Sequence, residues 1–404
     1  MFCLLQINVT AKWGSTGHIA EDIGQFVISH GWESHIAYGR YVNDSKSQLF
    51  HIGAKNSIYG HLLLTRLFDR HGLASKQATR QLITYIEKIK PDIIHLHNIH
   101  GYYLNYPILF DYLSRTDIPV IWTLHDCWTF TGHCAYYDYI KCERWKAECH
   151  DCPQKKKYPT SLLFDRSRKN FRDKKRWFTS LRNLTLVPVS KWLENEVKQS
   201  FLKDFPIETI RNGIDLEIFK PCSIQKDVLG LDDKFIILGV ASVWSSRKGL
   251  EDFVLLRESL PDDYVIILVG LNDKQIKQLP AGIIGIPRTN TVQELIDYYS
   301  LANVYVNTSV EETLGMTTIE SLACGTPAIV YDATACPETV SSDCGFVVRP
   351  HNITELVMAI RHICSSNNQF SSAICRKWVE THFDKQISNE KYLSLYQRLI
   401  NKKP

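Results

Sequence analysis

Short apolar runs alternate with longer amphipathic stretches along the whole chain. Apolar runs of roughly four to eight residues are typical of strands buried in a parallel sheet, and the stretches between them have the length of covering helices. The expected strands are Phe2–Val9, Ser34–Tyr38, Asp92–His97, Val120–His125 and Leu184–Val189 in the first half, and Phe235–Val240, Val265–Val269, Val304–Asn307 and Ala328–Tyr331 in the second. The pattern predicts an α/β protein with two Rossmann-like domains.

The segment that joins the two halves has the composition of a connector. Arg211–Asp215 contains a glycine turn, and Pro221 follows shortly after it. We expect an N-terminal domain over residues 1–205, a C-terminal domain over 206–376, and a helical segment over 377–404 that packs back on the N-terminal domain. Open parallel sheets bind ligands at the carboxyl ends of their strands, so the active site is expected in a cleft between the domains.

Composition narrows the class of protein. The 404 residues are 44% hydrophobic and 22% charged, which is ordinary for a globular protein. The first residues turn polar at Gln6 and lack the basic start and apolar run of a signal peptide, and no stretch has the roughly 18 apolar residues of a membrane span. We therefore expect a cytoplasmic protein, with peripheral attachment to the inner face of the plasma membrane left open. Its 12 cysteines are then expected to be core residues or metal ligands.

One string in the second half carries the strongest chemical signal. It runs over Glu311–Glu320 and ends in Gly325-Thr326-Pro327. Gly315 lets the backbone turn sharply after a strand, and the next residues, Met316, Thr317 and Thr318, open a helix whose free amides and dipole favour phosphate. Glu320 lies one turn further on, where a carboxylate can accept hydrogen bonds from ribose hydroxyls, and Glu312 precedes the turn. The alternative is a capped, solvated helix with surface carboxylates.

This string resembles the E-x7-E signature of retaining GT-B glycosyltransferases, especially glycosyltransferase family 4, with Glu312 and Glu320 as the two acids. Further matches extend over nearly the whole chain. They are the Asn-Gly-Ile-Asp connector with Phe219 and Pro221, the segment Pro287-Arg288 with Glu294-Leu295 and Tyr298-Tyr299, and Arg247-Lys248-Gly249-Leu250 after the first strand of the second half. The resemblance implies a GT-B fold, in which two Rossmann-like domains face an interdomain cleft.

The resemblance also implies roles for individual residues. Glu312 is expected to be catalytic, whereas Glu320 and the helix start at Gly315, Met316, Thr317 and Thr318 are expected to bind the donor nucleotide. Lys248 and Arg247 are expected to neutralise the diphosphate as it leaves. Many relatives carry this arginine five residues before the lysine, where the present chain has Val243. Solvated loop charges are the alternative for both cations.

Two features of the first half resemble acceptor-side motifs of the family. Gly14-Ser15-Thr16-Gly17 precedes a helix-like run over His18–Ile28, and in the family the loop that contains Gly17 faces the diphosphate and the acceptor. His125 ends a predicted strand and matches a cleft histidine that contacts donor sugar or acceptor. The alternative for Gly17 is a simple turn, and the alternative for His125 is a structural, hydrogen-bonded histidine. The structural alternative applies more strongly to His97.

The implied reaction moves a sugar from a nucleotide sugar to a glycan or polyprenyl-linked acceptor during surface polysaccharide assembly. The resemblance implies retention of configuration, with the leaving phosphate assisting deprotonation of the acceptor. The chain contains no Asp-x-Asp, so we expect no metal-bridged diphosphate and no catalytic cofactor. A GT-B-fold phosphorylase, a nucleotide-sugar epimerase and a catalytically silent binding homologue are the competing hypotheses.

Four cysteines lie close together in an expected insertion over about residues 127–160. Cys134, Cys142, Cys149 and Cys152 are surrounded by polar residues with little apolar periodicity. Four thiolates that end in a C-x-x-C pair suit tetrahedral zinc, so a structural zinc ion is expected here. Structural cysteines, either reduced or paired in disulfides, are the alternative.

A basic stretch follows the cysteines. Residues 155–182 hold eleven Lys or Arg against two Asp, while the whole chain has a net charge of only +4. Phe164, Phe171, Phe178 and Leu181 are expected on one face of a basic helix, which predicts either contact with an anionic membrane surface or packing on the core with solvated charges. No recognised nucleic-acid motif accompanies the charge, so nucleic acid is not an expected partner.

Overall fold

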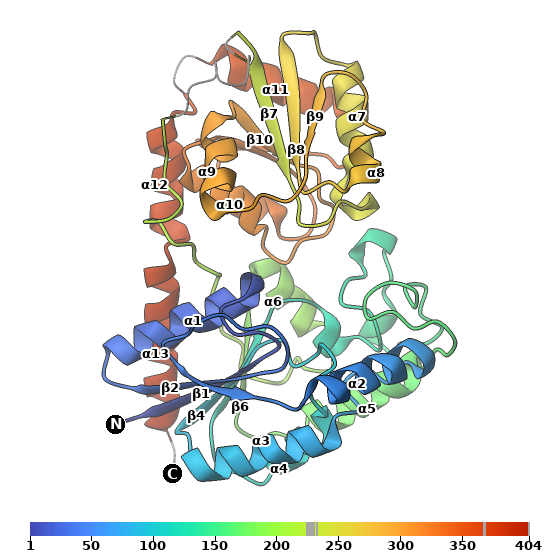
Figure 1. The fold of residues 1–404 in the computed structure, drawn as a ribbon, viewed down its shortest axis with the longest axis vertical. Helices are drawn as coiled ribbons and strands as arrows, with labels where there is room; N and C mark the ends of the chain where they lie inside the picture. Colours follow the sequence, from blue (N-terminus) through green and yellow to red (C-terminus); the bar gives the residue numbers. More distant parts are fainter. Residues whose placement is uncertain (224–230, 232, 367–368, 403–404) are drawn as a thin grey trace. The chain divides into compact units, whose positions relative to one another are not determined.

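The computed structural model describes residues 1–223, 231, 233–366 and 369–402. The chain forms two compact units, Met1–Arg211 with Ser388–Pro404, and Asn212–Ile387. Each unit is built on one six-stranded sheet whose paired strands are all parallel (Figure 1). The predicted α/β architecture with two Rossmann-like domains is confirmed.

The sheet of the first unit has the strand order β3-β2-β1-β4-β5-β6. Its strands are β1 (Cys3–Asn8), β2 (Glu33–Tyr38), β3 (Gln48–His51), β4 (Ile93–Leu96), β5 (Val120–Leu124) and β6 (Leu184–Pro188). Its helices include α1 (Gly14–Ser29), α2 (Lys55–Phe68), α3 (Lys76–Ile89), α4 (Tyr106–Leu113), α5 (Ser167–Phe178), α6 (Lys191–Lys198) and most of α13 (Lys385–Ile400). The order reverses between β1 and β4, the position where doubly wound sheets bind ligands.

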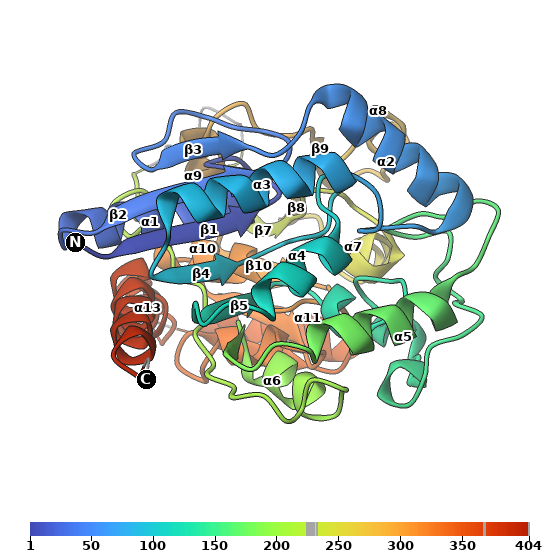
Figure 2. The same cartoon turned by 90° about the horizontal axis from the view of Figure 1, so that it is seen from below.

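Alternate residues of β5 face the two sides of this sheet. Ile121 lies in a core that also contains α1 and α13, whereas Trp122 packs against Phe110 of α4 and Phe178 of α5. Helices α3, α4 and α5 follow one another along that second side (Figure 2). Because both sides are covered, the strand is apolar throughout, as parallel strands are.

The C-terminal helix α13 completes the core of the first unit, although it follows the second unit in the chain. Tyr392 and Tyr396 are buried among residues of β1, β4 and α1. The hydroxyl of Tyr396 lies 2.6 Å from Nδ1 of His95, and that of Tyr392 lies 2.9 Å from Oγ1 of Thr123. The chain enters the second unit after Arg211 and returns at Ser388, compared with the predicted boundaries after residues 205 and 376.

The second unit repeats the same topology, with the strand order β12-β11-β10-β7-β8-β9. Its strands are β7 (Phe235–Val240), β8 (Tyr264–Val269), β9 (Ile283–Ile286), β10 (Val304–Asn307), β11 (Ala328–Tyr331) and β12 (Gly345–Val348). Its helices include α7 (Leu250–Glu258), α8 (Asp273–Ile276), α9 (Val292–Leu301), α10 (Met316–Ala323), α11 (Ile353–Ser365) and α12 (Ser372–His382). The first strand of the unit, β7, therefore lies beside β10, whose carboxyl end leads to α10.

Three edge strands, β3, β9 and β12, are missing from the prediction. Each has four residues; β3 is largely exposed, and β9 and β12 are only partly buried and contain Gly285 and Gly345. β3 has a polar residue at each end, and β9 and β12 are short apolar runs that contain a glycine, which weakens the local signal of a strand. Among the described residues, none of the helices combines the length and apolar character needed to cross a bilayer.

Candidate active site

The turn before α10 forms the centre of the candidate site in the second unit. β10 ends at Asn307, and Gly315 adopts a left-handed φ of 94° at the N-cap of α10. Asn307 holds the turn at two points, because its Nδ2 donates to Oγ1 of Thr318 at 3.1 Å and its Oδ1 accepts from the amide of Ser309 at 3.0 Å. A helix leaves its first amides without intrahelical partners, so Met316 and Thr317 supply donors suited to an anion. The amide of Thr318, which was expected to join them, donates instead to the carbonyl of Gly315 at 3.1 Å.

Glu320 lies one turn inside α10 and is held by a neighbouring helix. The hydroxyl of Tyr299, from α9, donates to Oε2 of Glu320 at 2.7 Å. Burial raises the pKa of Glu320, and the hydrogen bond from Tyr299 only partly opposes this effect. No function was assigned to Tyr299 from the sequence. In the structure, Tyr299 is the residue that orients the carboxylate of Glu320.

Glu312 and Lys248 form an ion pair between Oε1 and Nζ, with side chains that are 16% and 15% exposed. Burial alone would raise the pKa of Glu312, but Lys248 and Arg247 hold it below its usual value. The amide of Glu312 also donates to Oγ1 of Thr334 at 2.9 Å. The structure therefore pairs Lys248 with Glu312, two residues whose roles were predicted separately from the sequence.

The backbone around Lys248 is held close to the loop after β10. Oγ1 of Thr308 donates to the carbonyl of Lys248 at 2.8 Å. Gly249 follows with a φ of 69°, and a Cβ there would lie 2.6 Å from the carbonyl oxygen of Thr308. Only glycine permits both this conformation and this approach, which brings Lys248 to Glu312.

Arg247 also reaches the same loop. Its Nη1 donates to the carbonyl of Glu311 at 3.2 Å, and its own carbonyl accepts from the amide of Val310 at 3.0 Å. Val243, at the position where many relatives of the resembled family carry an arginine, is 69% exposed. Arg247 thus adds a second positive charge beside Glu312.

His125 in the first unit lies just after β5 and is buried. Its Nε2 lies 3.2 Å from Nδ1 of His97, whose Nε2 lies 3.0 Å from Oε1 of Gln6. Burial lowers the pKa of His125 to about 4, although Asp126 opposes the shift. The imidazole is consequently neutral near pH 7 and forms part of a chain that crosses β1, β4 and β5.

A second polar chain beside His125 was not expected from the sequence. Asp126 Oδ2 lies 2.8 Å from Nε2 of His100, and Nδ1 of His100 lies 2.9 Å from the hydroxyl of Tyr158. Asp126 Oδ1 also accepts from the amide of Trp128 at 2.9 Å. The His-Asp dipeptide at the end of a predicted strand was the available signal, but His100, the side-chain partner of Asp126, lies 26 residues earlier in the sequence.

Gly17 occupies a different local structure from the one predicted. Helix α1 begins at Gly14, so Gly17 lies in its first turn and not in a loop before a helix at His18. A Cβ at Gly17 would lie 2.7 Å from Oγ1 of Thr10 and 3.2 Å from the amide of Lys12. Gly17 therefore lets α1 pack closely against the loop after β1.

The predicted aromatic stripe of the basic stretch is only partly correct. Phe171, Phe178 and Leu181 are buried, which agrees with packing on the core. Phe164 precedes α5 and is 54% exposed, so it does not belong to the same helical face. Lys174 is only 1% exposed, so the surface charge is smaller than the sequence suggested.

Two groups of side chains have the chemistry of metal ligands. All four predicted cysteines line one small cavity. Among the residues that the structure describes, a tighter group consists of Cys3, Glu33 and His35, whose donor atoms lie within 4.8 Å of one another. Both ring nitrogens of His35 are already hydrogen-bonded, to Tyr85 and Glu33, so this second group is poorly suited to a metal.

Two family models match most of the chain. The model described as "Glycosyltransferase Family 4" matches residues 19–218, and "Glycosyl transferases group 1" matches residues 234–366. The first match covers most of the unit that carries His125. The second covers the site around Glu312, Glu320 and Lys248.

Curated relatives match parts of the chain. The putative colanic acid biosynthesis glycosyl transferase WcaC of Escherichia coli is 28% identical over 53% of this chain and 55% of its own length. Alpha-monoglucosyldiacylglycerol synthase of Acholeplasma laidlawii is 26% identical over 63% of this chain and 62% of its own length. The chain thus spans little more than half of the length of these relatives.

Solved structures match the whole chain in fold. Sucrose-phosphate synthase of Thermosynechococcus elongatus has a TM-score of 0.75 at 18% identity, with 99% of this chain and 100% of the other covered. Anabaena HepE in complex with UDP-glucose has a TM-score of 0.65 at 15% identity, with 98% and 100% covered. At these identities the likeness shows the fold, and the predicted GT-B fold is confirmed.

Proposed function

Because both halves of this chain match glycosyltransferase family models, we propose that it transfers a sugar from a nucleotide-sugar donor to a hydroxyl of a glycan or lipid-linked acceptor. The observation that carries the proposal is the Lys248–Glu312 ion pair beside the glycine turn that opens α10, with Glu320 one turn further on. Cations and free helix amides suit a diphosphate, and an aimed carboxylate suits ribose hydroxyls. The HepE structure in complex with UDP-glucose supports a donor of this class.

The proposed reaction retains configuration at the sugar. The bond between the anomeric carbon and the diphosphate oxygen breaks, and the acceptor oxygen bonds to that carbon on the same face. The acceptor proton passes to the departing phosphate oxygen. Lys248, Arg247 and the amides at Met316 and Thr317 stabilise the negative charge that develops on the diphosphate, so no metal ion is required.

The first unit is assigned to the acceptor in this proposal. His125 is neutral near pH 7, and its ring can form hydrogen bonds with a sugar hydroxyl. The names of the curated relatives, a putative colanic acid transferase and a glucosyldiacylglycerol synthase, support an acceptor in surface polysaccharide or glycolipid assembly. We assign the chain to surface polysaccharide assembly on the cytoplasmic side of the membrane.

An exposed apolar surface supports contact of the first unit with an anionic membrane. Leu162, Leu163 and Phe164 are 54–62% exposed, and Phe164 stacks on Phe68 of α2 at a centroid distance of 5.5 Å. The exposed lysines Lys156 and Lys157 precede these residues. Apolar side chains next to cations are the combination that binds the surface of acidic lipid.

The decisive experiment is a screen of nucleotide sugars against the purified chain. A ligand at 100 times its dissociation constant stabilises a protein by about 2.7 kcal/mol, which a thermal shift detects. The best donor is then incubated with lipid extracts and oligosaccharides, and the products are identified by mass spectrometry. Transfer with release of nucleoside diphosphate is expected.

Three other results would contradict the proposal. Consumption of inorganic phosphate would indicate a phosphorylase, and conversion of the donor into its stereoisomer would indicate an epimerase. Binding of a donor without hydrolysis or transfer, with every acceptor extract, would indicate a silent binding protein.

A further inference from the structure

The four cysteines of the insertion meet at one small cavity, although they are spread over nineteen residues of sequence. Cys134, Cys142, Cys149 and Cys152 all line a space of about 10 Å³, roughly the room of a single water-sized sphere. All four are free thiols. No three of the sulfurs lie mutually within 4.8 Å, so an ion would draw them inward. The cavity has the size for one ion and the chemistry for a soft one.

The protein already organises the backbone around three of these sulfurs. Cys134 and Cys152 are hydrogen-bonded to each other through their side chains. The amide of Gly132 donates to Sγ of Cys149 at 3.2 Å. The amide of Cys152 donates to Oδ2 of Asp165 at 2.6 Å, which anchors the loop next to α5. An amide donor to sulfur favours the thiolate form, the form that binds metals.

One side of the cavity is closed by aromatic residues that the sequence reading overlooked. Trp145 is 1% exposed and packs against Phe130 at 5.1 Å and Tyr137 at 4.9 Å between ring centroids. The insertion is therefore less polar at its centre than its composition suggested. This apolar group shields the thiols from water on that side, which favours strong metal–thiolate bonds, while Cys142, Cys149 and Cys152 remain partly exposed.

A buried lysine lies beside the thiols. Nζ of Lys174 donates to the carbonyls of Trp128 at 2.5 Å and Thr131 at 3.0 Å, and it lies 3.5 Å from the centre of the Trp128 ring. Among the described residues, no carboxylate forms an ion pair with Lys174. Burial lowers the pKa of Lys174 to about 7, and thiolates at Cys149 and Cys134 would oppose this shift. A buried charge needs compensation, and thiolates at this cavity would supply it.

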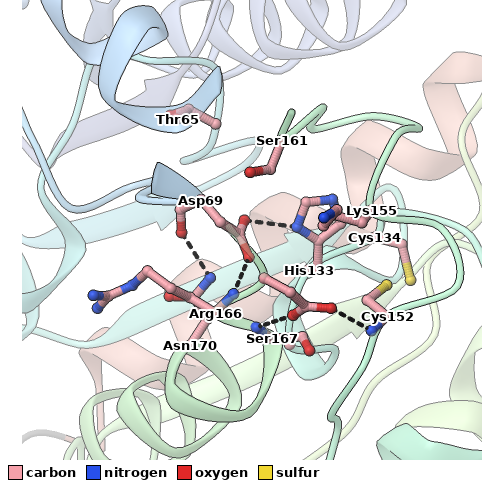
Figure 3. A network of polar contacts seen from close by, with 12 residues as sticks. Thr65, Asp69, His133, Cys134, Cys152, Lys155, Ser161, Arg166, Ser167 and Asn170 are labelled. Atoms are coloured by element: carbon pink, nitrogen blue, oxygen red, sulfur yellow. Dashed lines mark hydrogen bonds and ion pairs between the residues drawn. The ribbon is translucent and has the colours of Figure 1, made fainter. Parts of the chain in front are cut away.

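His133 lines the same cavity and is held from behind by a carboxylate. Its Nδ1 lies 2.6 Å from Oδ1 of Asp69, and its buried Nε2 has no hydrogen-bond partner (Figure 3). Asp69 is itself fixed, because its Oδ2 accepts from the amide of Arg166 at 2.8 Å and its carbonyl accepts from Nδ2 of Asn170 at 2.9 Å. The imidazole of His133 and the amino group of Lys174 thus lie near the thiols, and each can carry a positive charge.

We propose that Cys134, Cys142, Cys149 and Cys152 bind one zinc ion as thiolates, with Lys174 and His133 as positioning residues that balance its charge. Four thiolates around Zn²⁺ carry a net charge of −2, which a buried ammonium group offsets in part. The site joins the insertion to α5, since Lys174 belongs to that helix and also holds the carbonyls of Trp128 and Thr131. Its role is structural, and it lies in a single unit.

Elemental analysis of the full chain, purified under reducing conditions, is the direct test. About one zinc per chain is expected. Replacement of zinc by Co²⁺ should produce the near-ultraviolet charge-transfer band of cobalt–thiolate bonds and the visible bands of tetrahedral cobalt. Iron in place of zinc, no metal after growth with added zinc, or disulfides among these cysteines in protein alkylated before reduction would each overturn the proposal.

Variants separate the ligands from their neighbours. Cys149→Ser combined with Cys152→Ser should lose the zinc, while Cys364→Ser, at an exposed cysteine outside the cavity, should retain it. Lys174→Met keeps the aliphatic stem and should keep the zinc, but with an affinity about 10- to 100-fold weaker in competition with a chelator. His133→Asn should behave likewise, and complete loss of metal in it would make His133 a ligand and overturn the four-cysteine assignment.

A double cysteine variant that folds poorly loses its zinc for that reason alone, so the wild type provides an independent measurement. Removal of zinc by a chelator should increase hydrogen exchange near residues 127–160 and leave exchange around α10 unchanged. Unchanged exchange in both regions would contradict a structural zinc. Nucleotide binding is measured on the same samples, so failure of the zinc proposal is distinguishable from failure of the proposed function.

Discussion

Lys248 and Glu312 form an ion pair in the second unit, with both side chains only about one-sixth exposed. In Lys248→Met, Glu312 keeps its buried position and loses its charged partner. A hydrogen bond to a charged group contributes about 1.5–3 kcal/mol, so the second unit should lose stability of this order. Turnover should fall by about 10²- to 10³-fold, the usual effect of removing one group that stabilises developing charge. Thermal unfolding and a transfer assay measure the two effects.

The pH dependence of the stability lost in Lys248→Met provides a control. Lys248 holds the pKa of Glu312 below the ordinary value of 4.5, so the stabilisation is present above pH 4.5 and is lost as pH falls through the lowered pKa. The difference in stability between wild type and Lys248→Met should therefore shrink on acidification. A difference that is constant from neutral to acidic pH would mean that the lysine stabilises the unit without pairing with Glu312.

Glu320→Ala should weaken nucleotide binding, because the carboxylate that would accept hydrogen bonds from the ribose is removed. One hydrogen bond to a charged group contributes about 1.5–3 kcal/mol, which predicts a dissociation constant about 10- to 100-fold higher by calorimetry. Glu258→Ala, which removes an exposed glutamate at the end of α7, is the matched control and should bind normally. Equal affinities of the two variants would remove Glu320 from the site.

Nucleotide binding should also depend on pH through Glu320. Burial raises the pKa of Glu320 above 4.5, so this carboxylate takes up its proton at a higher pH than an exposed glutamate does. Protonation removes an acceptor, and affinity should therefore decrease on acidification while pH is still above 4.5. In Glu320→Gln this part of the pH dependence should disappear, and its persistence would assign it to another group.

Turnover should be independent of Mg²⁺ and Mn²⁺. The proposed site neutralises the diphosphate with Lys248, Arg247 and helix amides, and the chain contains no Asp-x-Asp. Enzyme treated briefly with a chelator should show the same rate with and without either added ion. A strict requirement for added Mg²⁺ or Mn²⁺ would exclude the proposed chemistry, whereas the zinc proposed above would affect stability.

Binding to acidic vesicles should depend on both charge and salt. Replacing Arg168, Lys169, Arg172, Lys175 and Arg176 with Gln leaves the buried Phe171 and Phe178 in place, so the fold should survive. Flotation with vesicles should decrease in this variant and at high salt, because the attraction is screened over about 8 Å at physiological ionic strength. Lys274→Gln with Lys277→Gln, in the second unit, is the control. Equal flotation under all conditions would show that the basic face is only solvated.

Leu162, Leu163 and Phe164 test the apolar part of the same surface. Replacing all three with Ser should reduce flotation even at low salt, because the buried apolar area at the membrane is lost. Phe164 stacks on Phe68, so circular dichroism is needed to confirm that the fold is unchanged. A folded variant that floats like the wild type would limit the membrane contact to charge.

The sequence alone determined the two parallel sheets and the string at α10, and tertiary structure decided what surrounds them. The central strands and the turn at Gly315 depend on local patterns, namely apolar runs and a glycine before a helix, so they were predictable. The edge strands β3, β9 and β12 are short and either have polar residues at their ends or contain a glycine, so their local signal was weak. The ion pair of Lys248 with Glu312, the support of Glu320 by Tyr299, and the burial of Lys174 beside the cysteines depend on distant segments. A pattern along the chain identifies residues with chemical capacity, but their partners are set by how the sheets and helices pack, and that packing is not encoded in any short stretch.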